Sequence, residues 1–206
     1  MKLPRKRGRP KRPLEDADAR NRLIREGLVF LTERGYSAAG VNDILDAAGV
    51  PKGSFYHYFK SKADFGSQLI DAYAAYFAKK LDRSLSDESL DPLGRLRAFV
   101  EDAAEGMARH DFTRGCLVGN LGQEMGLLPD DFREKLRAIF AAWEARVRVC
   151  LEMARDQGQI SRIQKADTLA RFFWIGWEGA VLRAKLDRCR DPLDTFANVF
   201  FEMIES

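Results

Sequence analysis

Apolar residues recur every three to four positions along most of the chain, which is the spacing of amphipathic α-helices. From Leu14 onward, no run of alternating β-branched residues is long enough to predict a strand. The pattern therefore predicts an all-α protein in which short helices near the N-terminus precede longer ones. The expected helices cover residues 16–34, 41–48, 52–59, 62–83, 92–110, 113–125, 129–157, 165–187 and 192–204.

Glycine, serine and proline mark the ends of these helices. Gly35 is expected to end the first helix in the left-handed region, and Gly49 to close the second. Ser61 can cap the long helix that follows it, and Pro92 suits the first turn of another. The predicted parts are a disordered basic arm (1–13), a three-helix helix-turn-helix domain (14–62) and a larger helical ligand-binding and dimerisation domain (63–206).

The composition narrows the class of protein. The chain is 46% hydrophobic and 32% charged, which is typical of a globular protein and not of a disordered one. No apolar run approaches 18 residues, so no transmembrane helix is expected. The three cysteines have no CxxC spacing, and no glycine-rich phosphate loop is present, so we expect no metal or other cofactor. A reducing cytoplasm fits this cysteine usage best.

Charge is distributed unevenly along the chain. Residues 1–62 carry 14 basic and 7 acidic side chains, a net charge of +7, whereas residues 63–206 carry 20 and 24. A cationic end favours an anionic polymer as partner, and double-stranded DNA is the leading candidate. A solubilising tail and a membrane-surface patch are the alternatives.

The basic arm contains Arg7-Gly8-Arg9-Pro10, which resembles the core of an AT-hook. Glycine permits close approach to a surface, and proline keeps the chain extended. Arg7 and Arg9 can then enter a narrow A·T-rich minor groove, where the negative potential is enhanced. An arm that touches phosphates without base preference is the alternative.

The clearest motif is the pair of short helices separated by Gly49-Val50-Pro51, which has the size and turn of a helix-turn-helix. In the second of these helices, Phe55 and Phe59 lie at i and i+4 and are expected to pack inward together. The residues left to face outward supply hydrogen-bond donors for phosphates and base edges in a major groove. These residues are Lys52, Ser54, Tyr56, His57 and Tyr58.

The segment 47–62, AAGVPKGSFYHYFKSK, resembles the signature of the TetR family of transcriptional repressors. The resemblance implies an all-α homodimer that binds an operator through its N-terminal domain and a small-molecule effector through its C-terminal domain. By the same resemblance, Tyr58 and Lys62 hold phosphates. The residues implied to read the operator are Lys52, Gly53, Ser54, Tyr56 and His57. The family usually has Ser or Thr where Gly40 stands, so Asn42 is expected to matter more for DNA contact.

The last two helices are expected to form the dimer interface. The helix at 165–187 carries apolar side chains around much of its circumference, and the final helix adds four more, including Phe196 and Val199. Two such helices from each subunit make a four-helix interface. A monomeric core is the alternative, but a twofold dimer fits two half-sites about one DNA turn apart, ~34–36 Å.

The segment 114–124, RGCLVGNLGQE, holds three glycines within a predicted helix. Cys116 is expected in its first turn, where the helix dipole lowers the pKa of a thiol. This segment resembles a subgroup of the family that senses reactive electrophiles, the N-ethylmaleimide-type and acrylate-type repressors. By that resemblance Cys116 and Lys185 face one pocket. A buried, unreactive cysteine is the alternative.

Further pocket residues are predicted from residue type alone. Aromatic side chains are common in pocket walls, although at helical spacing they are more often core. The candidates for the pocket walls are Trp143, Trp174 and Trp177, with Tyr73, Tyr76 and Phe112. The candidates for binding a carboxylate are Arg183, Lys185 and Asn120.

The leading hypothesis is a ligand-responsive repressor that is not an enzyme. A thiol-dependent enzyme built on Cys116 and an architectural binder of A·T-rich DNA are the alternatives.

Overall fold

The structure is a computed structural model that describes residues 13–161, 163 and 165–205. Within this described part, every regular element is a helix. The predicted all-α class is confirmed, with an N-terminal helix-turn-helix and a helical C-terminal domain. The predictions for Arg7 and Arg9 lie outside the described residues.

The N-terminal unit consists of α1 (Pro13–Arg34), α2 (Val41–Ala47), a 3-10 turn (Lys52–Ser54) and α3 (Phe55–Tyr58). The helix predicted at 52–59 is therefore half 3-10 and shorter than expected, because Phe59 is already extended, with φ −136° and ψ 137°. Phe55 and Phe59 are both buried, as predicted, with ring centroids 5.4 Å apart.

Two turns in this unit require glycine. Gly35 has φ +82° and Gly49 has φ +61°, and side chains are strained in that region of backbone space. Both glycines follow helix ends, as the sequence predicted. The end of α2 is also held by Arg22 of α1, whose Nε donates to the Ala48 carbonyl at 3.0 Å.

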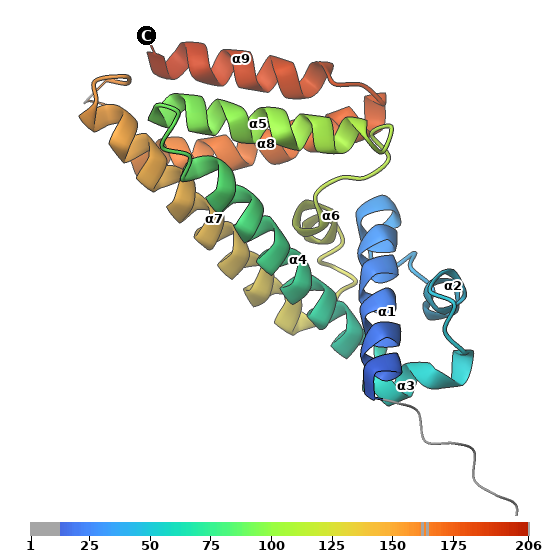
Figure 1. Cartoon of the computed structure of the whole chain (residues 1–206). Coiled ribbons are helices and arrows are strands. Elements are labelled where there is room, and N and C mark those ends of the chain that lie inside the picture. The colour runs from blue at the N-terminus through green and yellow to red at the C-terminus, as the bar shows by residue number, and fades with distance from the viewer. Residues whose placement is uncertain (1–12, 162, 164, 206) are drawn as a thin grey trace, which may run out of the picture.

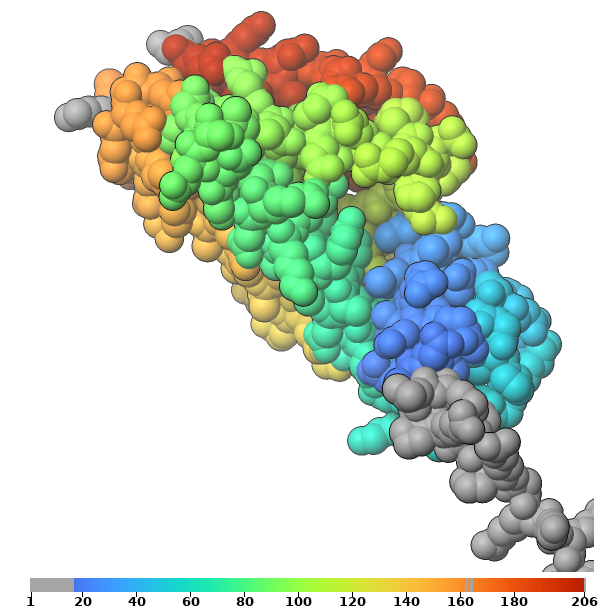
Figure 2. Space-filling view, viewed as in Figure 1, coloured from blue at the N-terminus to red at the C-terminus, as the bar shows by residue number. Residues whose placement is uncertain are grey.

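Six further helices form the rest of the described chain: α4 (Lys62–Leu85), α5 (Pro92–Ala108), α6 (Leu117–Gln123), α7 (Asp130–Asp156), α8 (Ala166–Asp187) and α9 (Asp191–Glu205). Figure 1 shows α4 and α7 side by side as a long pair, with α5, α8 and α9 stacked across one end. Two side-chain caps fix helix starts: Ser61 Oγ accepts from Asp64 N at 3.0 Å, and Asp91 Oδ1 from Gly94 N at 2.7 Å. In the space-filling view the α1–α3 unit and α9 lie at opposite ends of the molecule (Figure 2).

Aromatic rings fill the centre of the C-terminal domain. Trp143 and Trp174 are each 1% exposed and pack with ring centroids 5.0 Å apart. Phe77 lies 4.4 Å from Trp143 by the same measure. Neither tryptophan is among the residues that line the cavity between α4, α5 and α8, so their place in a pocket wall stays a prediction. They are core residues, because α7 and α8 bury both against α4.

The helix predicted at 113–125 is much shorter than expected. Residues Asp111 and Phe112 both have positive φ, near 50°, so the chain after α5 turns sharply and runs irregularly to Cys116. Cys116 is the N-cap of α6 and not a first-turn residue. The other predicted ends agree with the structure to within a few residues.

One face of α8 and α9 is apolar and exposed. On α8, Phe172 is 45%, Ile175 67% and Leu186 71% exposed, and on α9 Val199 is 59% exposed. In soluble monomers exposed apolar patches of this kind are small, so a continuous one marks a surface that binds another protein.

Candidate functional site

The predicted DNA-reading residues lie at the exposed end of the N-terminal unit. Tyr56 is 78% exposed, and its ring stands edge-on against buried Phe55 at 5.3 Å. Lys52, Gly53 and His57 are also exposed, whereas Ser54 is half-buried. The packing of Phe55 therefore fixes a small helix whose outward face carries hydrogen-bonding side chains.

Neighbouring charges and rings hold other residues of this face. Lys52 Nζ lies 3.4 Å from the Asp46 carboxylate, and both side chains are well exposed. Lys62 lies over the Tyr36 ring, 4.7 Å from its centroid. Asn42 is exposed in the first turn of α2, and Tyr58 is half-buried beside His57. These positions leave the predicted side chains at or near the surface that α3 presents.

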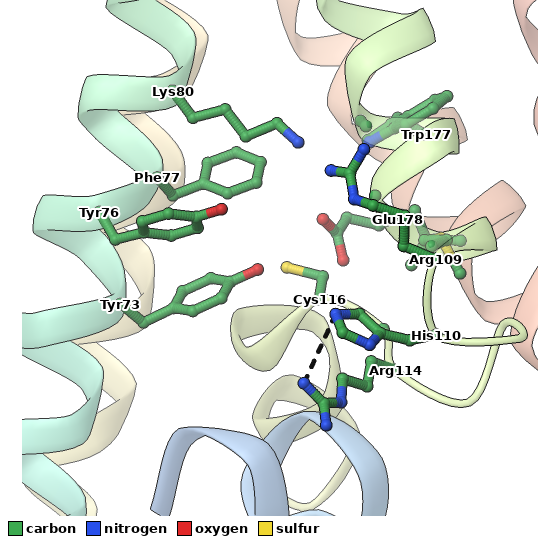
Figure 3. A pocket seen from close by; sticks show the side chains of 15 residues that line it. Tyr73, Tyr76, Phe77, Lys80, Arg109, His110, Arg114, Cys116, Trp177 and Glu178 are labelled. Atoms are coloured by element: carbon green, nitrogen blue, oxygen red, sulfur yellow. Dashed lines mark hydrogen bonds between the residues drawn. The ribbon is translucent and has the colours of Figure 1, made fainter. Parts of the chain in front are cut away.

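The second candidate site is a cavity of about 180 Å³ between α4, the end of α5, the start of α6 and α8. Its inner wall is formed by Tyr73, Phe77, Cys116, Trp177 and Glu178. Figure 3 shows the Cys116 thiol, the Glu178 carboxylate and the Tyr73 hydroxyl turned toward one another. A dry apolar cavity of about 150 Å³ holds benzene, so this one suits a small ligand.

Basic side chains line the mouth of the cavity. These residues are Lys80, Arg109, His110 and Arg114. Lys80 pairs with Asp102 at 3.2 Å, and burial lowers the pKa of this lysine although Asp102 opposes the effect. Arg114 pairs with Glu33 of α1 at 3.0 Å. Arg109 lies 3.8 Å from the Glu105 carboxylate. An anionic group that enters the cavity therefore meets N–H donors whose charges are balanced by neighbouring carboxylates.

The Cys116 thiol is not a preformed thiolate. Cys116 is 8% exposed, and burial, followed by the neighbouring Glu178, raises the pKa of its thiol well above the usual value. Two contacts oppose this rise: a hydrogen bond from Gly119 N at 3.5 Å and one with the Tyr73 side chain. The predicted lowering of this pKa by the helix dipole is thus wrong, because desolvation and a like-charged neighbour exceed the effect of a two-turn helix.

Glu178 is the principal site residue that the sequence analysis missed. Burial raises the pKa of its carboxyl to about 7, and the hydrogen bond with Cys116 lowers it only in part. Between about pH 4.5 and pH 7, the folded chain therefore keeps a proton on Glu178 that the unfolded chain has released. Stability falls as the pH rises through this range, because ionising the buried carboxyl costs free energy. A signal existed: Glu178 is a single acid within the apolar stretch Phe172–Leu182.

A set of contacts joins the cavity region to the end of α1. Lys185 Nζ donates to the carbonyls of Thr32 and Glu33, at 3.1 and 2.8 Å. Asn120 Nδ2 donates to the carbonyls of Leu31 and Thr32, at 3.1 and 2.9 Å. These side chains satisfy carbonyl groups that a helix end leaves without partners. We call Asn120 and Lys185 the α1 clamp.

The α1 clamp revises the predicted role of Lys185. Cys116 and Lys185 do line one cavity, a second one of about 350 Å³ on the other side of Glu178. The ammonium group, however, is held by α1 carbonyls, and burial lowers the pKa of this lysine. Lys185 is not among the charges that contribute to the pKa of Cys116. The expected thiolate-stabilising ammonium is therefore absent at this thiol among the described residues.

Replacing Lys185 with methionine is expected to lower the free energy of unfolding by about 1–2 kcal/mol. The change removes a charged cap from the last carbonyls of α1. Chemical denaturation of the purified protein measures the loss. Lys79→Met, at an exposed position of α4, is the matched control and should cost far less. Equal losses in both variants would show that the α1 clamp adds nothing to stability.

Comparison with known proteins identifies the family to which this chain belongs. Residues 23–66 match the model "Bacterial regulatory proteins, tetR family", and residues 92–200 match "Tetracyclin repressor-like, C-terminal domain". The chain is 56% identical to the transcriptional regulator AcuR of Cereibacter sphaeroides, over 95% of this chain and 89% of the relative. It is 29% identical to the repressor NemR of Escherichia coli K12, over 86% and 89%.

A solved structure agrees with these relatives. The regulatory protein TetR from Rhodobacter sphaeroides superposes with a TM-score of 0.89 and 56% identity, over 90% of this chain and 98% of that one. The matches to AcuR and NemR confirm the predicted resemblance to the electrophile-sensing subgroup. Among the described residues no helix is both long and apolar enough to cross a membrane.

Proposed function

Because the chain belongs to the tetR family of bacterial regulatory proteins, we propose that it is a repressor released from a palindromic operator by a small electrophile. The ligand class is an unsaturated compound such as acrylate or its thioester. The observation that carries the proposal is the Cys116 thiol in the wall of a small cavity with basic side chains at its mouth.

The α3 face reads the operator in this proposal. Tyr56, His57 and Lys52 are exposed donors on a short element that fits a major groove. The remaining contacts to base edges and phosphates come from Asn42, Gly53, Ser54, Tyr58 and Lys62, and from Arg7 and Arg9 of the arm. The arm (1–13) and the helix-turn-helix domain (14–62) together form the DNA-binding part.

The exposed apolar face of α8 and α9 forms the homodimer interface in this proposal. A dimer places one recognition helix on each half-site, and its twofold axis matches the palindrome. The domain of residues 63–206 thus provides both the partner surface and the ligand cavity.

Ligand entry is proposed to favour a dimer that no longer fits its operator. The cavity reaches Cys116, the N-cap of α6, and Asn120 of α6 holds the end of α1, so a shift of α6 moves the DNA-binding unit. The effect on DNA equals the difference in ligand affinity between the two dimer states. Trp177 forms part of the apolar wall, and the basic mouth attracts the carboxylate.

Acrylate is expected to release the wild-type protein from its operator, with one adduct mass on Cys116. Cys116→Ser should lose the covalent response, because the hydroxyl of serine is a far weaker nucleophile than a thiol. Operator release against ligand dose is measured in parallel with intact-protein mass. Cys189→Ser, which alters the half-buried cysteine, is the matched control and should respond like wild type.

The proposal is wrong if the wild-type protein stays on its operator with every unsaturated acid, thioester, aldehyde and quinone tried. Release of both wild type and Cys116→Ser by one compound, without an adduct, would instead assign the cavity to a non-covalent ligand.

A further inference from the structure

We propose that Glu178 is the acid–base residue of ligand addition, taking the proton from the Cys116 thiol and returning it to the ligand. This inference rests on the proposed electrophile response and names the group that makes a buried thiol reactive. Its basis is the position of the carboxyl between two cavities, both of which Cys116 also lines.

The absence of a side chain at Gly119 leaves room for the Glu178 carboxyl. A Cβ at Gly119 would overlap Glu178 Oε2, so only glycine at this position lets the carboxyl approach α6 so closely. In Figure 3 the carboxyl is turned toward the Cys116 sulfur. Within the described part of the chain, Glu178 forms no ion pair, and its one hydrogen-bonding influence is Cys116. A buried carboxyl that is turned into a cavity and forms no ion pair is available for proton transfer.

The thiol needs such a partner. Only the thiolate adds rapidly to a carbon electrophile, and the pKa of Cys116 is raised by burial and by Glu178. The pKa of Glu178, raised to about 7, leaves both of its protonation states populated near neutral pH. This is the condition under which one group serves as base and then as acid.

The other titratable groups around Glu178 come from three sides. Tyr73, Tyr76 and Lys80 face it from α4, and Arg109, His110 and Arg114 come from the segment after α5. Lys185 lies about two turns after Glu178 along α8 and lines the second cavity. Burial and the Cys116 contact govern the pKa of Glu178, and the charge of Glu178 in turn raises the pKa of Tyr73.

The step conserves atoms and electrons. The Glu178 carboxylate accepts the Cys116 proton while the sulfur electron pair forms a bond to the β-carbon of the ligand. The π pair of the C=C bond moves to the α-carbon and is delocalised onto the carbonyl oxygen. The protonated Glu178 then donates its proton to the α-carbon, which yields a saturated thioether and restores the carboxylate.

The test is the rate of Cys116 alkylation by acrylamide, a neutral unsaturated probe. Peptide mapping by mass reports Cys116 and Cys189 in the same sample, so Cys189 is an internal reference. Wild-type Cys116 should react with a rate that rises through about pH 7. Glu178→Gln should slow Cys116 by ~100-fold at pH 7.5 and abolish that inflection, because general base catalysis is lost. Glu178→Asp should restore part of the rate.

Faster alkylation of Cys116 in Glu178→Gln than in wild type would overturn the proposal. Because the Glu178 charge raises the pKa of the thiol, a merely neighbouring role predicts that Glu178→Gln alkylates Cys116 faster than wild type. An unchanged rate overturns it as well. Glu88→Gln, in the exposed linker after α4, is the control variant and should match wild type.

A second variant tests placement and not charge. Gly119→Ala keeps the carboxyl but displaces it from the thiol, and alanine suits a helix, so α6 should persist. Slow alkylation in this variant supports the proposal, and wild-type rate and pH profile contradict it. A wild-type Cys116 that reacts with no unsaturated compound would refute the proposed function itself. A reactive wild type with an equally fast Glu178→Gln refutes only the role of Glu178.

Discussion

Tyr56→Ala is expected to weaken specific operator binding by about 1–3 kcal/mol for each recognition helix, which is roughly 5- to 150-fold. The ring is 78% exposed, yet its edge contact with buried Phe55 holds it in one orientation. Few exposed side chains are both large and fixed, so its removal costs contacts without unfolding the helix. Titration of a labelled operator, at one stated salt concentration, measures the change.

Two further measurements make this expectation specific. Tyr56→Phe keeps the ring and separates the hydroxyl contact from the packing contact. Affinity for unrelated DNA should barely change in either variant, because phosphate contacts dominate non-specific binding. Unchanged operator affinity in a folded, dimeric Tyr56→Ala protein would remove Tyr56 from the DNA-reading surface.

Ile175→Glu is expected to convert the protein to monomers and to reduce operator affinity by ~100-fold or more. The side chain is 67% exposed on the apolar face of α8 and α9. A twofold interface repeats the substitution, so two buried carboxylates would lose their hydration. Without the dimer, the second half-site no longer benefits from a high effective concentration of the second recognition helix. Light scattering after size exclusion gives the mass.

Leu127→Glu provides the matched comparison for this experiment. Leu127 is 78% exposed in the connection between α6 and α7, away from the apolar face. It should stay dimeric and bind the operator normally. A dimeric Ile175→Glu protein would place the interface elsewhere.

Helix positions followed from the sequence because their signals are local. Gly35 and Gly49 occupy left-handed positions, and Ser61 caps α4, as residue type alone indicated. The inward packing of Phe55 and Phe59 also followed from their i, i+4 spacing. These features depend on a few neighbouring residues, which the sequence displays directly.

The chemistry of the cavity did not follow, because it depends on contacts between distant segments. The helix-dipole argument for Cys116 was local and was reversed by burial under α4 and α8. Lys185 was expected beside the thiol, but the carbonyls at the end of α1, about 150 positions earlier, hold its ammonium. Glu178 is the single acid of an apolar stretch, but the sequence does not show that its carboxyl is buried beside Cys116. Likewise, only the structure shows which tryptophans are core residues and which one lines the cavity.

The contact of Glu124 with the start of the α1–α2 turn limits how this regulator can be recombined. Its carboxylate accepts from Tyr36 N at 2.9 Å and from Ser37 N at 2.8 Å, and it occupies the space beside Gly35. In a chimera, this DNA-binding unit would be joined to the sensor domain of another protein. The amides of Tyr36 and Ser37 would then lack an acceptor unless the other protein has a carboxylate at the position of Glu124. Functional grafts should therefore exchange residues 31–37 and 114–124 as one matched set, and a fusion at residue 62 alone should produce regulators that bind DNA but respond poorly to ligand.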